Sequence, residues 1–115
     1  MPDSGQDLIL ALREQRALLI DTVNAMKVIG RLLAQSTKEY KVALRKEILR
    51  LHIDENVAWT ACYDLALGHD IVSELRFKRD IKKSDYDVCI EKIAQIKLEM
   101  RILEGEIKAD MQYNS

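Results

Sequence analysis

Proline and glycine are scarce in this chain of 115 residues, which holds one proline and four glycines. Aromatic residues make up only 5% of it, and turn residues do not recur at the short intervals that separate strands. Charged residues reach 32% and apolar residues 48%, a mixture that is typical of long helices. A β-sandwich is therefore excluded. The length predicts one all-helical domain, residues 1–115, with a single core.

Neither sign of charge dominates, because Lys and Arg number 18 against 19 acidic residues. No net field therefore attracts the whole chain to nucleic acid or to an anionic lipid surface. The first residues lack the basic start and apolar core of a secretory signal, and no apolar run reaches the roughly 18 residues that a membrane span needs. We expect a soluble, cytoplasmic protein that does not contact a membrane.

Apolar residues recur at helical spacing over residues 6–52, which predicts one long helix there. Ser4 or Asp7 is its expected cap, because a short side-chain oxygen accepts a hydrogen bond from an unpaired backbone N–H. Gly30 and Thr37 fall on its apolar face, so a neighbouring backbone is expected to approach closely there. The predicted buried face consists of Leu8, Leu12, Leu19, Val23, Met26, Gly30, Leu33, Thr37, Tyr40, Leu44, Ile48 and Leu51.

A shorter helix is predicted over residues 56–68, with Asn56 as its cap. Gly68 is expected to end this helix in a left-handed conformation, and Asp70 is expected to cap a second long helix over residues 70–112. A connection of this size lets the second long helix return antiparallel to the first. The predicted fold is a coiled-coil-like helical hairpin with a short helix at its tip.

The second long helix has a clear heptad pattern, in which every first (a) and fourth (d) residue faces a partner helix. The expected hairpin or dimer core is Tyr86, Ile93, Ile96, Met100, Leu103 and Ile107. Arg79 and Lys82 interrupt the pattern, so they must reach water, pair with carboxylates or face a polar partner. The a series is Val72, Arg79, Tyr86, Ile93, Met100 and Ile107, and the d series is Leu75, Lys82, Cys89, Ile96, Leu103 and Asp110.

Further apolar residues lie outside a two-helix seam and need another cover. A homodimer that forms a four-helix bundle is the simpler prediction, and a hetero-partner is the alternative. The residues concerned are Ile9, Ile20, Ile29, Val88, Ile90 and Ile102.

Catalytic and metal-binding patterns are weak, so we predict no enzyme, no metal and no cofactor. His52 and His69 flank the short helix, and Cys62 and Cys89 lie outside any C-x-x-C pair. A Cys62–His69 pair would lack an oxyanion donor. We interpret both cysteines as small buried hydrophobic residues, kept as thiols in a reducing compartment.

Two features near the predicted tip suit partner binding. Trp59 and Tyr63 are one helical turn apart and form an aromatic ridge, which either anchors a protein partner or packs under the tip. Basic residues gather on both long helices near the tip, where they form either a solvated surface or a docking site for an acidic partner. The predicted basic zone consists of Lys41, Arg45, Lys46, Arg50, Arg76, Lys78, Arg79, Lys82 and Lys83. The candidates for partner binding among them are Arg45, Arg50, Arg76, Arg79, Lys82 and Lys83.

The segment Ala61–Arg79 resembles a helix-turn-helix, with a short helix, a turn at Gly68 and a basic second helix. In that motif the early residues of the second helix read bases and the cations hold phosphates. Those early positions are occupied here by Ile71, Val72, Ser73 and Glu74. The alternative function is therefore DNA binding through a basic tip.

The stretches DLALGHDIVSELRFKRD (64–80) and IKLEMRILEGEIK (96–108), with Tyr86 between them, resemble small prophage-encoded proteins of Gram-positive bacteria. The resemblance covers about residues 38–110. It implies a compact phage product in the cytoplasm of a bacterial host. The function predicted on that basis is binding of a partner protein, as a stoichiometric inhibitor of a host nucleic-acid or defence enzyme such as a CRISPR nuclease.

Overall fold

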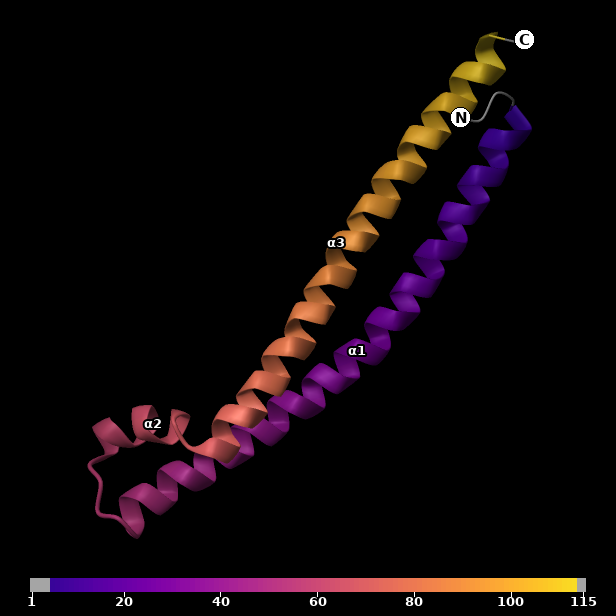
Figure 1. Ribbon diagram of the computed structural model, residues 1–115. Coiled ribbons are helices and arrows are strands. Elements are labelled where there is room, and N and C mark those ends of the chain that lie inside the picture. The colour runs from indigo at the N-terminus through magenta and orange to yellow at the C-terminus, as the bar shows by residue number, and fades with distance from the viewer. Residues whose placement is uncertain (1–4, 114–115) are drawn as a thin grey trace. The chain divides into compact units, whose positions relative to one another are not determined.

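The computed structural model describes residues 5–113 and contains three helices, α1 (Gly5–Ile53), α2 (Trp59–Leu67) and α3 (Asp70–Tyr113) (Figure 1). These described residues form no strand. The predicted all-helical fold, with two long helices and a short one between them, is therefore confirmed. The helix bounds differ from the predicted ones by one residue at most ends and by three residues at the start of α2. Ser4, one of the two predicted caps, lies outside the described residues, and Asp7 lies inside the first turn of α1.

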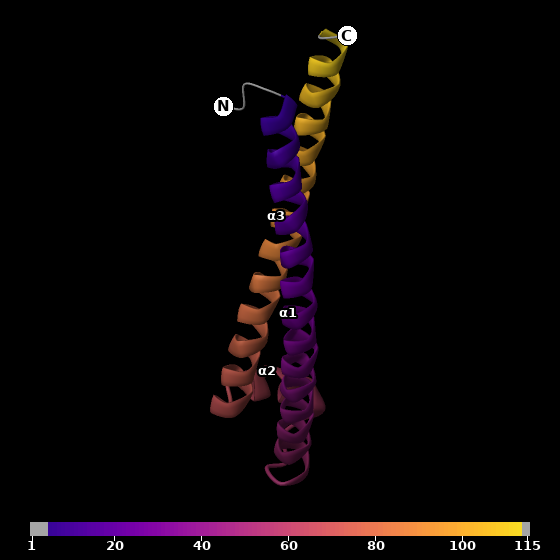
Figure 2. The same ribbon diagram turned by 90° about the vertical axis from the view of Figure 1, so that its right-hand side faces the viewer.

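Contacts divide the chain into two compact units. Unit 1 combines the chain up to Lys27 with the chain from Asp87 onward, and unit 2 is Val28–Tyr86. Within unit 1 the start of α1 lies beside the end of α3 (Figures 1 and 2), and a Cβ atom at Gly5 would lie 2.9 Å from Oδ2 of Asp110. Within unit 2 the guanidinium carbon of Arg79 lies 4.8 Å from the ring centre of Tyr40. The two long helices therefore run antiparallel in each unit.

The burial pattern of α3 follows the predicted heptad. All of its a and d residues are fully or partly buried, and every other described position from Ile71 to Tyr113 is exposed. Val72, Cys89, Ile96 and Leu103 are the most buried of them. Of the two polar interruptions, Arg79 lies over the Tyr40 ring, and Lys82 is partly buried. The heptad prediction is confirmed at each of these positions.

The predicted apolar face of α1 is likewise fully or partly buried along its length. At Gly30 the close neighbour is a side chain and not the expected backbone, since a Cβ atom there would lie 3.3 Å from Cε2 of Tyr86. The absence of a side chain at Gly30 thus makes room for the Tyr86 ring. Thr22 is also buried, and its hydroxyl donates to the carbonyl of Leu18 at 2.7 Å.

Three expected features of the turns and helix ends are wrong. Asn56 does not cap α2, because Ala58 precedes the helix and Asn56 takes a left-handed backbone with φ of 59°. Asn tolerates this conformation better than most residues, so it serves the bend instead. Gly68 is not left-handed, since its φ is −84° and its N–H donates to the carbonyl of Leu65 in a tightened last turn. Asp70 is the first residue of α3 rather than the residue before it.

Candidate functional site

A shallow groove runs along the exposed face of α1 in unit 2, and we call it the basic groove. All of its lining residues belong to α1 and are spaced three or four apart, so they share one side of the helix. Val42 and Leu49 form its exposed apolar floor. The groove is lined by Ala34, Thr37, Lys38, Lys41, Val42, Arg45, Lys46 and Leu49.

The charged residues of the basic groove, Lys38, Lys41, Arg45 and Lys46, all carry positive charge. None of them makes an ion pair or a side-chain hydrogen bond with another residue in the described range 5–113. One acid borders the groove, since Glu39 lines an adjoining hollow with Lys38, Val42 and Lys46 and accepts a hydrogen bond from Gln35 at 3.0 Å. The lining of the groove itself combines apolar side chains with positive charge only.

Trp59, the first residue of α2, extends the groove at one end. It lines an adjoining hollow with Lys41, Leu44, Arg45, Ile48 and Leu49. The indole is 57% exposed, and it stacks on the His52 ring with centroids 3.6 Å apart and 20° between the planes. Nδ1 of His52 lies 2.8 Å from the carbonyl oxygen of Val57, which fixes the imidazole under the indole. Trp59 is thus exposed but held in one orientation.

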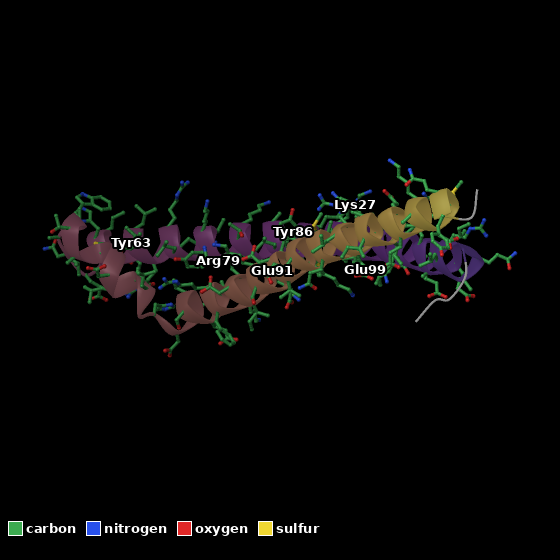
Figure 3. The ribbon with its side chains drawn as sticks, turned by 90° about the horizontal axis from the view of Figure 1, so that it is seen from above. Lys27, Tyr63, Arg79, Tyr86, Glu91 and Glu99 are labelled. Atoms are coloured by element: carbon green, nitrogen blue, oxygen red, sulfur yellow. The ribbon has the colours of Figure 1, made fainter. Side chains whose placement is uncertain are left out.

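The other side of α2 packs into the protein. Cys62 and Ala66 have no exposed surface, and Val72 of α3 is 1% exposed. The thiol of Cys62 donates to the carbonyl oxygen of Val57 at 3.5 Å, so it is occupied as well as buried. Tyr63, labelled in Figure 3, is 51% exposed. The aromatic ridge is therefore an exposed surface and not a packing layer under the tip.

Glu47 is a buried carboxylate in the seam of α1, only 8% exposed. Arg50 donates to both of its oxygens, from Nε at 3.0 Å to Oε2 and from Nη2 at 2.7 Å to Oε1, and this pairing holds the pKa of Glu47 below its usual range. Arg50 also pairs with Glu55 at 3.1 Å. Nε2 of His69 lies 3.7 Å from Oε2 of Glu47. Glu47 therefore does not line the basic groove, and Arg50 neutralises its charge.

The predicted basic residues differ in their surroundings. Arg45 lies in the basic groove beside Trp59, whereas Arg50 is engaged by two glutamates. Arg79 lies over Tyr40, and its Nε donates to Asp80 at 2.8 Å; Figure 3 labels Arg79 together with Tyr86 on α3. The remaining three are Lys82, partly buried in the seam, and Arg76 and Lys83, exposed on α3.

The helix-turn-helix-like segment presents few groups to a base edge. Val72, one of its expected reading positions, is buried in the core. The Ser73 hydroxyl donates to the carbonyl of Asp70 at 3.1 Å. Ile71 and Glu74 are exposed, but an alkyl group and a carboxylate do not hold phosphates.

Three groove residues, Lys38, Val42 and Leu49, were not predicted, whereas Lys41 and Lys46 belong to the predicted basic zone. A signal for them exists, because these positions recur at three and four residues on the side of the helix away from the predicted seam. Glu47 was also missed as a buried residue. Counting in sevens along α1 from Leu33 gives Tyr40 and then Glu47, which places this acid in the seam.

A second exposed surface lies on α3 in unit 1, and we call it the outer stripe. Its residues repeat at three and four positions on α3, outside the a and d seam. Gln95 lies at its edge, where it lines a hollow with Gln15 and Leu18 of α1. Val88 and Leu98 are 59% and 53% exposed. Glu91, labelled in Figure 3, is its only charged member. The outer stripe consists of Val88, Glu91, Gln95, Leu98, Ile102, Gly105 and Ala109.

No group of three side chains that could hold a metal ion occurs within the described residues. In the same range, no helix combines the length and the apolar character that crossing a membrane requires. No model of a known protein family, no curated protein and no solved structure matches this chain. The function proposed below therefore rests on the residues of the chain and their geometry.

Proposed function

We propose that this chain is a non-enzymatic binding protein that holds an acidic segment of a partner protein in the basic groove. The observation that carries the proposal is the set of four cations, without ion-pair partners among the described residues, around the exposed Val42 and Leu49. Trp59 is proposed as the anchor at the end of the groove. The partner segment that suits this surface is an amphipathic helix with apolar residues on one side and carboxylates at its edges.

Physical chemistry favours such an occupant for two reasons. Cations of one sign attract and orient an acidic partner, and they disfavour basic ones. A large aromatic side chain that is already fixed in place loses little conformational entropy on binding, and the stacking of Trp59 on His52 supplies that fixation. Both features lie in the same unit and border the same hollow.

DNA binding through the tip is the second candidate. The same four cations suit phosphates, which is the observation in its favour. The buried Val72 and the exposed Glu74 are less suited to reading a base than the helix-turn-helix resemblance implies. Phosphate binding would weaken steeply with salt, whereas a contact led by Trp59, Val42 and Leu49 would retain its apolar part.

The resemblance to prophage-encoded proteins narrows the protein partner to a host nucleic-acid or defence enzyme, such as a CRISPR nuclease, which the chain would inhibit stoichiometrically. That narrower assignment stays a prediction from resemblance. We also propose that the chain self-associates as a homodimer. The exposed apolar residues of unit 1, including Ile20, Val88 and Ile102, support self-association.

The test is capture of partners from a Gram-positive bacterial lysate, with and without nuclease, using the tagged chain and two matched variants. Lys41→Glu with Arg45→Glu reverses two groove charges, and Arg13→Glu with Lys97→Glu reverses two exposed cations in unit 1. We expect a stoichiometric protein that survives nuclease, is lost with the groove variant and is retained with the control. Its purified form should bind the chain directly. Capture of nucleic acid without such a protein would contradict partner-protein binding and support DNA binding instead.

A further inference from the structure

The outer stripe of α3 differs in composition from the exposed positions on either side of it. The stripe has a single charged residue, Glu91, over the 22 positions from Val88 to Ala109. The flanking exposed positions in the same stretch are charged except for Ile90 and Ala94. A mostly apolar stripe that is bordered by charged residues at heptad spacing is the pattern of a coiled-coil seam. The a and d seam of α3 already packs against α1, so the outer stripe is a second such seam.

We infer that the outer stripe is the contact surface for a second copy of this chain, with the two α3 helices antiparallel and residues 87–101 of each copy at the centre. The inference rests on the proposed self-association and is independent of the partner proposed for the basic groove. It specifies the surface, the direction and the register of the dimer.

The residues of the stripe match one another best in this antiparallel register. Val88 lies opposite Leu98 of the second copy, and Glu91 lies opposite Gln95, whose amide can donate to the carboxylate. A parallel pair would place Glu91 against Glu91 in the seam, where two like charges would be desolvated together. The single charged residue of the stripe therefore favours the antiparallel direction.

The flanking charges agree with the same register. Asp87 of one copy lies beside Arg101 of the other, and the two-fold symmetry repeats this pair. Within one chain these two residues are 14 positions apart, about 21 Å along the helix, so they do not pair with each other. Opposite charges at the two ends of this segment make the surface complementary to its own copy.

One flanking contact within unit 1 opposes association in this register, because Lys92 lies near Lys92 of the second copy. Both are exposed side chains with room to turn into water, so the repulsion costs a fraction of what a buried like pair would cost. The two symmetric Asp87–Arg101 pairs and the apolar layers favour association.

The experiment measures the dimer dissociation constant by sedimentation equilibrium for the full chain and three variants. Asp87→Lys and Arg101→Glu each replace an attraction by a repulsion at two symmetric places, and each is expected to weaken the dimer about tenfold. The double variant restores the pair in reversed order and should return to within about twofold of the unchanged chain. Circular dichroism checks that helix content is the same in all four.

A control variant reverses Lys97 and Glu104, which are exposed on α3 away from the outer stripe, and it should dimerise normally. A chain that stays monomeric would overturn both the self-association and its interface. Dimers whose dissociation constant does not change in Asp87→Lys and Arg101→Glu would confirm self-association but overturn this interface. Rescue of Asp87→Lys by Lys108→Glu, and not by Arg101→Glu, would contradict the register.

Discussion

The basic groove of α1 and the outer stripe of α3 are both exposed helical faces with apolar centres, but their charges differ in kind. The groove is bordered by four cations with no acid in its lining. The outer stripe is bordered by acids and bases that alternate in sign along the helix, such as Asp87 and Arg101. A surface of one sign repels its own copy, whereas a surface of ordered mixed signs can fit its copy in one register. The two faces are therefore suited to different partners.

The burial of Glu47 strengthens this contrast. Glu47 occupies a seam position of α1 and not a groove position, so its carboxylate does not line the groove. Arg50 donates to both of its oxygens. The neutralised pair therefore lies at the seam, and the four groove cations lie at the surface.

The largest expected effect is on partner binding. Lys41→Glu with Arg45→Glu should weaken the affinity for the captured protein about a hundredfold, because two attractive contacts become repulsive. Isothermal titration calorimetry with the purified partner measures this loss. Full affinity in the variant would show that the groove cations do not contact the partner.

A smaller loss is expected for the apolar centre of the outer stripe. Leu98→Asp should weaken the dimer by roughly thirtyfold, since it places a carboxylate in two apolar layers. The same change should leave the thermal stability of the monomer within about 2 °C, because Leu98 is exposed there. A dilution series in the ultracentrifuge measures the dimer dissociation constant, and thermal melting of dilute samples by circular dichroism measures the stability of the monomer.

Raising the salt concentration should weaken binding at the basic groove more than it weakens the dimer at the outer stripe. Raising the ionic strength from about 0.1 to 1 M shortens the screening length from roughly 10 to 3 Å. Partner binding at the basic groove should fall about tenfold, and the dimer should change less because its apolar layers are not screened. Equal salt dependence of both equilibria would remove the proposed difference between the faces.

The smallest effect concerns the pH dependence of stability. The pKa of Glu47 is lowered from its ordinary value of 4.5, chiefly by the hydrogen bonds from Arg50. Its carboxylate therefore stabilises the fold fully above that value, and the contribution is lost as the pH falls through the lowered pKa. Glu47→Gln should lower the melting temperature by a few degrees at pH 7 and flatten its acid dependence. Melting curves that remain parallel for both proteins from pH 7 to 3 would contradict this role.

The heptad of α3 was predictable at every a and d position because burial against a single helix imposes one repeat along its length. The ends of α2 were less predictable. Asn56 and Gly68 are both common at helix ends, and the choice between cap, bend and tightened turn depends on tertiary contacts such as the Cys62 thiol with the Val57 carbonyl.

The candidate site was predicted only in part. Trp59, Tyr63 and Arg45 stood out by residue type, and the structure leaves all three exposed. The engagement of Arg50 by Glu47, and of Arg79 by Tyr40 and Asp80, could not be predicted because it depends on which side chains the seam brings together. The groove could be located once the seam of α1 was known, since all of its lining residues except Thr37 lie outside that seam.

The most direct test of the separate roles of the two faces is to compare self-association of the groove variant and of Asp87→Lys. Sedimentation equilibrium measures both under the same conditions. We expect Lys41→Glu with Arg45→Glu to dimerise like the unchanged chain and Asp87→Lys to dissociate about tenfold more readily. The reverse result, with dimers lost in the groove variant and kept in Asp87→Lys, would show that the basic groove binds the second copy and would contradict the separate roles.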